Sequence, residues 1–423
     1  GVGDGEGAAG EGAGEGVGVA AGVGDGEGEG DGVGVGEGEG EGEGEGEGEG
    51  EGEGEGEGEG EGEGEGEGEV APGDAYVVSL GEVTPGRTGI TPELTVTIPE
   101  GAISFEIVAF GDSGGMYVVY ELEAPDGTLL VDPDTDVDLD PLAELILGSY
   151  AAQMFSPNRA VMGEGIGAVL VPNNPELTVL PGEYRFTLQA MNMNGNALRD
   201  PLPVEVWIKQ GPRPTEEVLD LHLHFSGSRD WTAASAPADE TFQQVLTRLA
   251  AIFAPAGILL GQISYQDIPE SFQVIGSIQG AGSELGELYE QSTGDTGINL
   301  FFVDRFELGM MGGQVGGIAG GIPGVPRRPG ASRSGVGVST SVDPDPAVIA
   351  HVMAHEMGHY LGLSHTTEMD LLGTHDNLSD TAEGPSGNDN LMYYTAGVDS
   401  LLTPQQQFVV HNSACLAPPE EEP

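Results

Sequence analysis

The hydrophobic pattern of the 423-residue chain changes twice, and the changes divide it into three segments. Residues 1–70 show no apolar periodicity, because glycine alternates there with Glu, Asp, Val or Ala. The next segment, which ends near Pro214, contains short runs of β-branched and aromatic residues separated by turn signals. After it, strand-like runs alternate with runs at helical spacing. We therefore predict a linker at 1–70 and folded domains at 71–214 and 215–423.

The second segment has the pattern of an antiparallel sheet protein. Its runs of Val, Ile, Thr, Phe and Tyr favour strands, and the Pro-Glu-Gly, Pro-Asp-Gly and Pro-Gly sequences between them favour turns. The expected strands are 94–98, 105–110, 117–122, 184–188 and 204–208. This pattern predicts an antiparallel β-sandwich.

The third segment mixes the two kinds of period. The expected strands are 219–225, 258–265, 298–303 and 335–341, and the expected helices are 242–253 and 285–289. Strands that alternate with helices imply a mixed sheet with helices packed on it. We therefore expect the chain to be of the α+β class.

Charge changes the picture of the first segment. Residues 1–70 hold 25 of the chain's 72 acidic side chains and none of its 12 basic ones. Glycine loses the most backbone entropy on ordering and like charges repel, so we predict that this tract is a disordered spacer. It is either a stalk that holds the folded domains away from a surface or a compositionally biased tail without a role. The stalk interpretation favours a secreted protein or one tethered at a bacterial cell surface.

The net charge of −60 also bears on partners. Nucleic acid and anionic lipid headgroups are bound by Lys/Arg patches, which this acidic chain lacks, so neither is an expected partner. No apolar run is long enough to span a bilayer. Cys415 is the only cysteine, which excludes an intrachain disulfide, and its apolar neighbours indicate a buried residue.

Two groups of polar residues have a metal-binding and an ordinary interpretation. Aspartates alternate from Asp132 to Asp140, and such a loop could bind calcium or could be a solvated acidic loop that lacks the EF-hand register. His222 and His224 lie at strand spacing and could chelate a metal or could be polar positions of a half-buried strand.

The main candidate chemistry lies on a predicted helix near residue 355. Asp345 is a good N-cap and Pro346 fits the first helical position, so we expect the helix to begin there and to run to Leu361. His355 and His359 are four residues apart, so both imidazoles project from one face and can share one ion.

The residues around these histidines predict a catalytic zinc site. Glu356 lies next to the first ligand, where its carboxylate can reach a metal-bound water as general base. Gly362 lets the chain turn at the helix end, so that His365 arrives as the third ligand. Three neutral histidines leave the fourth position of a tetrahedral Zn2+ site open, which is typical of a catalytic site.

The full motif resembles the metzincin zinc signature. It reads His355-Glu-Met-Gly-His359-Tyr-Leu-Gly362-Leu-Ser-His365. The resemblance implies a zinc endopeptidase in which Met392 forms the Met-turn beneath the metal and Tyr394 contacts the zinc or the oxyanion. Segments 317–323 and 376–381 look like the pappalysin and cytophagalysin branch, although the cysteine pair typical of that branch is missing.

The resemblance covers roughly residues 216–416, and it implies a twisted five-stranded sheet with an active-site helix and a C-terminal subdomain. A protein or peptide substrate would add to an edge strand near 317–322. The upstream domain loosely resembles pre-peptidase jelly-roll domains. His351 is interpreted as a residue that packs against the site, and His375 as a loop residue or as part of the cleft wall.

Two other classes of function remain open. One is a surface-anchored adhesin that holds zinc structurally while its β-sandwich binds a partner. The other is a zinc hydrolase that acts on a non-peptide substrate.

Overall fold

The computed structural model describes residues 73–112, 114–137, 151–307, 315–368, 374–395 and 401–419. The predicted spacer 1–70 therefore lies outside the described residues, as does the second half of the aspartate-rich loop. The described residues belong to one compact unit.

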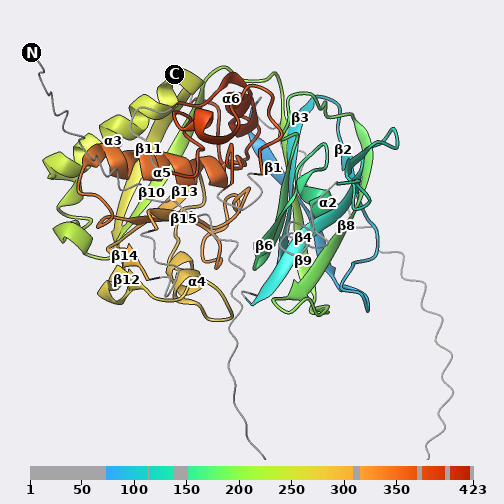
Figure 1. Ribbon diagram of the computed structural model, residues 1–423, viewed down its shortest axis with the longest axis horizontal. Helices are drawn as coiled ribbons and strands as arrows, with labels where there is room; N and C mark the ends of the chain where they lie inside the picture. The colour runs from blue at the N-terminus through green and yellow to red at the C-terminus, as the bar shows by residue number, and fades with distance from the viewer. Residues whose placement is uncertain are drawn as a thin grey trace, which may run out of the picture. The chain divides into compact units, whose positions relative to one another are not determined.

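The first folded part, drawn in blue to green in Figure 1, is built from antiparallel strands. Their order is β1-β9-β3-β7-β6-β4-β8-β2, with β5 beside β4. The strands are β1 (Ala75–Val83), β2 (Leu94–Ile98), β3 (Ala102–Phe110), β4 (Gly115–Glu123), β5 (Leu129–Val131), β6 (Val161–Glu164), β7 (Ile166–Val171), β8 (Gly182–Asn192) and β9 (Leu202–Gln210). A short helix, α2 (Ala151–Met154), precedes β6. The strands form two halves on either side of β6, one of β1, β9, β3 and β7 and the other of β4, β8, β2 and β5. One apolar core lies between the inner faces of these halves, and in it the rings of Phe105 and Tyr184 meet edge to face at 4.8 Å.

The short strand β6 connects the two halves of this β-sandwich. Val161 and Met162 pair with β7, whereas Gly163 and Glu164 pair with β4. The halves therefore form one continuous nine-stranded sheet instead of two separate sheets. The sequence pattern did not predict this strand, because four residues are too few to show a period.

The second folded part contains a five-stranded sheet in the order β11-β10-β13-β16-β15. Its strands are β10 (Glu217–Phe225), β11 (Ile258–Asp267), β13 (Ile298–Val303), β15 (Gly317–Ala319) and β16 (Val336–Ser339). Strands β11, β10, β13 and β16 are parallel to one another, and β15 runs antiparallel to β16 at the edge. All six residues of β13 are buried, as expected for a central strand covered on both faces. The predicted α+β class is confirmed.

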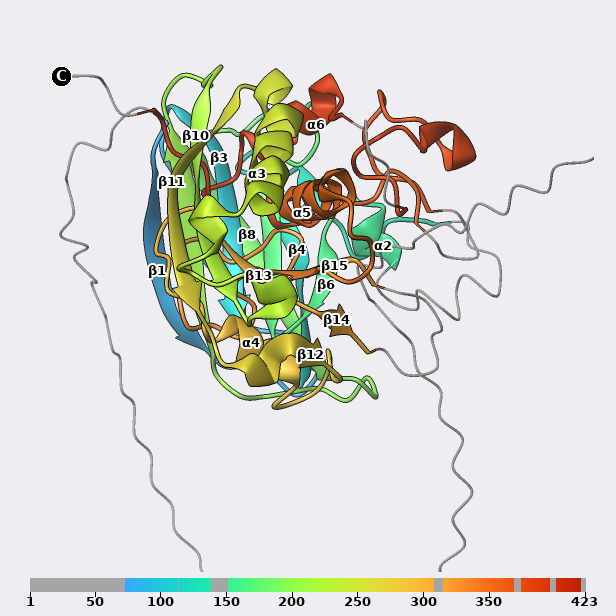
Figure 2. The same cartoon turned by 90° about the vertical axis from the view of Figure 1, so that its left-hand side faces the viewer.

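The other elements of this part are short, apart from two helices. The helices are α3 (Glu240–Phe253), α4 (Glu284–Tyr289), α5 (Pro346–Tyr360) and α6 (Pro404–Val410), and β12 (Val274–Ile275) pairs with β14 (Arg305–Phe306). Single 3-10 turns lie at Ser228–Asp230, Ala236–Ala238, Ala254–Ala256, Glu270–Gln273 and Gly384–Gly387. Helices α3 and α5 lie side by side over the same face of the sheet (Figures 1 and 2) and share its core.

A buried polar cluster lies where the two parts adjoin. Lys209 of β9 forms an ion pair with Glu217 of β10, with 2.5 Å between Nζ and Oε1, and donates to the carbonyl oxygens of His411 and Ser413. The other Glu217 oxygen contacts His411 Nδ1 at 2.5 Å. Burial lowers the pKa of Lys209, and the charge of Glu217 offsets part of that effect. The domain boundary predicted between residues 214 and 215 is thus crossed by a buried ion pair.

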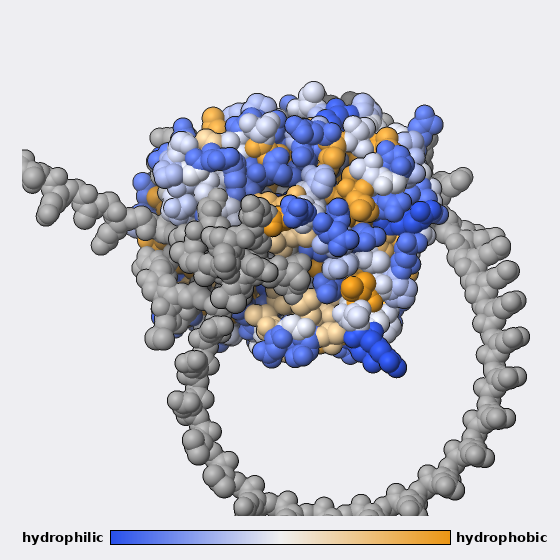
Figure 3. All heavy atoms as spheres, turned by 45° about the vertical axis from the view of Figure 1, so that its right-hand side comes forward, coloured by the Kyte–Doolittle hydropathy of each residue, from blue (hydrophilic) through white to orange (hydrophobic). Residues whose placement is uncertain are grey.

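The surface shown in Figure 3 is mostly hydrophilic, with apolar residues in small groups. The exposed large apolar side chains of the described residues are Val77, Phe155, Met193, Leu259 and Leu401. None of the described helices is both long enough and apolar enough to cross a membrane.

Candidate metal centre

Helix α5 is a buried helix that contains two of the predicted ligands. Its N-cap forms as expected, because the Asp345 side chain accepts a hydrogen bond from Ala347 N at 2.8 Å. Nearly every residue of the helix is buried, including His355, Glu356 and His359. Gly362 follows with φ of 102°, a conformation that glycine adopts without strain, and it redirects the chain so that His365 returns to the helix.

The three predicted histidines converge. Their Nε2 atoms lie 3.1 Å apart for His355 and His359, 3.1 Å for His359 and His365, and 3.2 Å for His355 and His365. Ligands about 2.1 Å from one ion in tetrahedral coordination are about 3.4 Å apart, so this triangle fits a metal ion. Within the described residues these three side chains form the group that could hold one.

The contacts of the three Nδ1 atoms indicate which tautomer of each imidazole is present. His355 Nδ1 faces the carbonyl oxygen of Leu391 and His359 Nδ1 faces that of Leu363, both at 2.7 Å. His365 Nδ1 faces Glu368 Oε2, also at 2.7 Å. Since an oxygen acceptor requires a proton on Nδ1, the neutral rings direct three Nε2 lone pairs at one another. That arrangement is repulsive unless a cation lies between them, and such hydrogen bonds orient metal-ligating histidines.

Burial favours the neutral, metal-binding form of His355 and His359. It lowers the pKa of His359 to about 3 and that of His355 well below its usual range. Burial alone would raise the pKa of Glu368, but its hydrogen bond to His365 and the positive charge of Arg159 lower it to about 2. Glu368 is therefore a carboxylate that accepts the His365 proton at neutral pH.

Glu356 lies against the edge strand. Its carboxylate is buried, and neither oxygen has a hydrogen-bond partner of normal geometry among the described residues. Burial raises the pKa of Glu356 to about 8, and the backbone of Ala319 offsets part of that effect. A Cβ on Gly317 of β15 would come within 3.0 Å of the Glu356 side chain, so the carboxylate fits only because this position is glycine. A buried carboxylate with a raised pKa beside a candidate metal site is a candidate proton acceptor.

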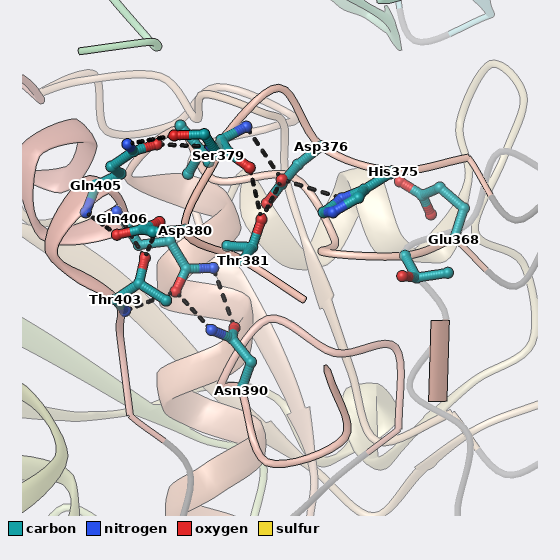
Figure 4. A network of polar contacts seen from close by, with 12 residues as sticks. Glu368, His375, Asp376, Ser379, Asp380, Thr381, Asn390, Thr403, Gln405 and Gln406 are labelled. Carbon is teal, nitrogen blue, oxygen red and sulfur yellow. Dashed lines mark hydrogen bonds and ion pairs between the residues drawn. The ribbon is translucent and has the colours of Figure 1, made fainter. Parts of the chain in front are cut away.

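Met392 packs beneath α5 next to the histidines. The side chain is fully buried, and a Cβ on Gly358 would lie 2.5 Å from its sulfur. Its carbonyl oxygen accepts from Thr366 N at 2.9 Å, and its N–H donates to Asn390 Oδ1 at 2.8 Å. Asn390 is held in turn by two amide hydrogen bonds with Gln406 of α6 (Figure 4). The segment that presents the Leu391 carbonyl to His355 is therefore tied to the last helix.

None of the contacts found among the described residues joins Tyr394 to the three histidines. Tyr394 is half-buried, and its ring contact in the described part of the chain is with Tyr393, 4.5 Å away between centroids. Its expected contact with a metal or an oxyanion stays a prediction.

The other candidate histidines lie outside the cluster. His222 contacts Ser264 Oγ at 2.8 Å and the Thr296 carbonyl oxygen at 2.9 Å, and His224 contacts Asn299 Oδ1 at 2.9 Å, as ordinary polar residues of β10 do. The ring of His351 is buried and lies 6.4 Å from that of His355. His375 lies 3.2 Å from Asp376 Oδ1 on the loop shown in Figure 4.

The remaining two expectations concern the aspartate-rich loop and the cysteine. Asp132, Asp134 and Asp136 are described and belong to no group of described side chains that could hold a metal, while Asp138 and Asp140 lie outside the described residues. Cys415 is buried, and burial raises the pKa of its thiol to about 12, which fits an inert residue.

Sequence reasoning missed two residues at this centre, Glu368 and Arg159, and it did not indicate that Gly317 of the expected edge strand contacts Glu356. The spacing of Glu368, three residues after His365, was a local signal that could have indicated a partner for its ring. No local signal exists for Arg159, whose ion pair with Glu368 joins positions 209 residues apart.

Comparison with known proteins supports a metallopeptidase. A family model described as Metallo-peptidase family M12 (Reprolysin_5) matches residues 308–407, which include the three histidines and Glu356. This family implies a metal, usually zinc, and action on proteins or peptides. Among solved structures, metalloproteinase-II from Bacteroides fragilis matches with 14% identity and a TM-score of 0.27, over 52% of this chain and 63% of that one. A search of curated proteins found no match.

Proposed function

We propose that this protein is a zinc-dependent endopeptidase of the metzincin type, and that it belongs near the pappalysin and cytophagalysin branch. The observation that carries the proposal is the convergence of three Nε2 lone pairs, with every Nδ1 proton already held by an acceptor, beside the buried carboxylate of Glu356. An adhesin that uses zinc only structurally has no need for such a carboxylate.

Each residue has a distinct part in the proposed reaction. A zinc ion bound by the three Nε2 atoms would supply Lewis acidity, which polarises the scissile carbonyl and acidifies water. Glu356 accepts a proton from the attacking water on a carboxylate oxygen and later passes it to the nitrogen of the leaving amine. Tyr394 is proposed to stabilise the oxyanion.

The edge strand β15 is the proposed binding site for the substrate. It pairs with β16 on one side and ends the sheet, so an extended peptide can add to its other side through main-chain hydrogen bonds. The hydroxyl of Tyr289 donates to the Ile318 carbonyl oxygen at 2.6 Å and holds the strand in place. Because Gly317 lies against Glu356, a peptide bound here passes close to the proton acceptor.

We also propose that the protein is secreted or tethered at the cell surface. This part of the proposal rests only on the acidic composition of residues 1–70.

The decisive experiment compares wild type with Glu356→Gln on an unfolded protein substrate, with zinc content measured in both. The amide keeps the shape but cannot accept the proton, so the rate should fall by about 10²- to 10⁴-fold while zinc remains bound. His359→Ala should lose zinc and activity together, because it removes a ligand. Equal cleavage by wild type and Glu356→Gln would remove Glu356 from the mechanism. No cleavage by a zinc-loaded wild type would favour an adhesin or a hydrolase of other substrates.

A further inference from the structure

Arg159 belongs to the β-sandwich and is fixed there. It lies just before β6, and its main chain is held from both sides by Asn173, which accepts from Arg159 N at 3.1 Å and donates to Arg159 O at 2.6 Å. Asn158 beside it donates to the carbonyl oxygen of Leu170 in β7 at 3.0 Å. The backbone from which the guanidinium extends is therefore part of the sandwich framework.

The side chain of Arg159 reaches across to the metal centre. It is only 4% exposed, and its guanidinium lies 3.5 Å from Glu368 Oε1 while donating to the His375 carbonyl oxygen at 3.3 Å. Glu368 uses its other oxygen, Oε2, to accept the Nδ1 proton of His365. Arg159, Glu368 and His365 thus form a chain of polar contacts, and the last of the three is a candidate metal ligand.

The loop around His375 meets the same part of the sandwich. Thr367 and His375 form a bridge between the two chain segments that flank residues 369–373. Asn377 Nδ2 donates to Asn173 Oδ1 and to the Pro157 carbonyl oxygen, both at 3.4 Å. The segment with His365 and Glu368 is therefore held against the sandwich by several contacts, of which Arg159 is the charged one.

Charge gives Arg159 a part that a neutral residue could not take. Glu368 is three-quarters buried and is a carboxylate in a chain with six times as many acidic as basic side chains. Among the described residues, Arg159 is the arginine paired with it. A partly buried carboxylate without its cation turns toward water, and its hold on a neighbouring imidazole weakens.

We propose that Arg159 is a positioning residue for the metal site, so that the upstream β-sandwich completes the support of the third ligand. The inference rests on the proposed function in that it takes His365 as a metal ligand. It assigns the sandwich a part in metal binding that the pattern of its sequence did not indicate. Residues that support a ligand in this way are worth about 10- to 100-fold in metal affinity.

The test uses the full-length protein and four variants: Arg159→Met, Arg159→Lys, Glu368→Gln and Arg185→Met. Zinc affinity is measured by competition with a chelator, and the absorption spectrum of the cobalt-substituted protein reports the ligand geometry. Arg159→Met should bind zinc about 10- to 100-fold more weakly and alter the cobalt spectrum. Arg159→Lys keeps the charge and should recover most of the affinity. Arg185→Met, which removes an exposed ion pair with Glu183 elsewhere in the sandwich, should leave zinc binding unchanged.

A double-mutant cycle separates positioning from mere stability. In a Glu368→Gln background, Arg159→Met should cost little further affinity, because both variants break the same line of contacts. A purely structural role would lower the melting temperature of the metal-free protein but leave the zinc affinity and cobalt spectrum of the folded protein as in wild type, and that result would overturn the inference. If Arg159→Met fails to fold, unchanged zinc affinity in Glu368→Gln overturns it equally. A wild type that binds no zinc would instead overturn the proposed function.

Discussion

Gly317 of the edge strand lies directly against Glu356 of α5, with no room for a side chain between them. A Cβ at this position would approach Cγ of Glu356 far more closely than real contacts allow, and would lie 3.0 Å from its carboxylate carbon. The strand that is proposed to bind the peptide therefore also sets the position of the proposed proton acceptor.

The first prediction follows from this contact. Gly317→Ala should push the Glu356 carboxylate away and lower kcat/KM by about 100-fold, as displacements near 1 Å do, while zinc content stays at the wild-type level. Gly276→Ala is the control, since a Cβ there would meet only the flexible end of Glu284 at 3.3 Å. Wild-type kinetics in Gly317→Ala would show that the carboxylate is not confined by β15.

A second prediction concerns the contact between Gly358 and Met392. Replacing a helical glycine by alanine normally stabilises a helix by about 1 kcal/mol. Here the new Cβ would lie 2.5 Å from the Met392 sulfur and 3.2 Å from its methyl carbon, so Gly358→Ala should lower the free energy of unfolding. Chemical denaturation measures the sign. The double variant Gly358→Ala/Met392→Ala should lose less than the sum of the single losses, and simple additivity would refute the contact.

The third prediction tests the buried ion pair between the two folded parts. Lys209→Met leaves the charge of Glu217 buried without its cation, which costs about 3–5 kcal/mol of stability. Arg305→Met, which breaks exposed pairs with Asp304 and Glu307, should cost much less. Urea denaturation of the full chain compares them. Similar losses in the two variants would mean that the pair at the junction is no more important than a surface pair.

The fourth prediction is a pH dependence of stability that arises from His224. Burial lowers the pKa of this residue from about 6.5 to about 4, so the folded protein binds the proton less tightly than the unfolded chain does. The stability is therefore full above pH 6.5 and falls as the pH drops toward 4, by about 3 kcal/mol in total.

His224→Gln removes this titration and can keep the contact with Asn299. The difference between the unfolding free energies of wild type and variant should change between pH 6.5 and 4 and be constant above pH 7, because all other groups titrate alike in both. A difference that does not vary with pH would contradict the assignment to His224.

Local patterns predicted the elements that carry the chemistry. Three of these patterns are the N-cap at Asp345, the spacing of the histidines and the turn at Gly362. Each depends on residues that are close together in the sequence, so its effect can be predicted from the sequence. Strands β2 and β13 have the bounds expected from their apolar runs. The same reasoning missed β1, β5, β6 and β7, of which β5 and β6 have three and four residues and show no period.

Contacts between distant parts of the chain could not be predicted. Lys209 directly follows the expected strand 204–208, and its burial depends on Glu217 and on the carbonyl oxygens that follow α6. Arg159 is likewise defined by a partner 209 residues away. A single sequence shows which residue types are present, but it does not show which of them are in contact in the folded protein.

The burial of Lys209 has a practical consequence for chemical labelling. It is the only lysine of the chain, and its side chain is 1% exposed. Amine-reactive dyes and cross-linkers therefore have no lysine to reach while the protein is folded. The rate at which such a reagent modifies Lys209 would instead report how often β9, β10 and the end of α6 separate.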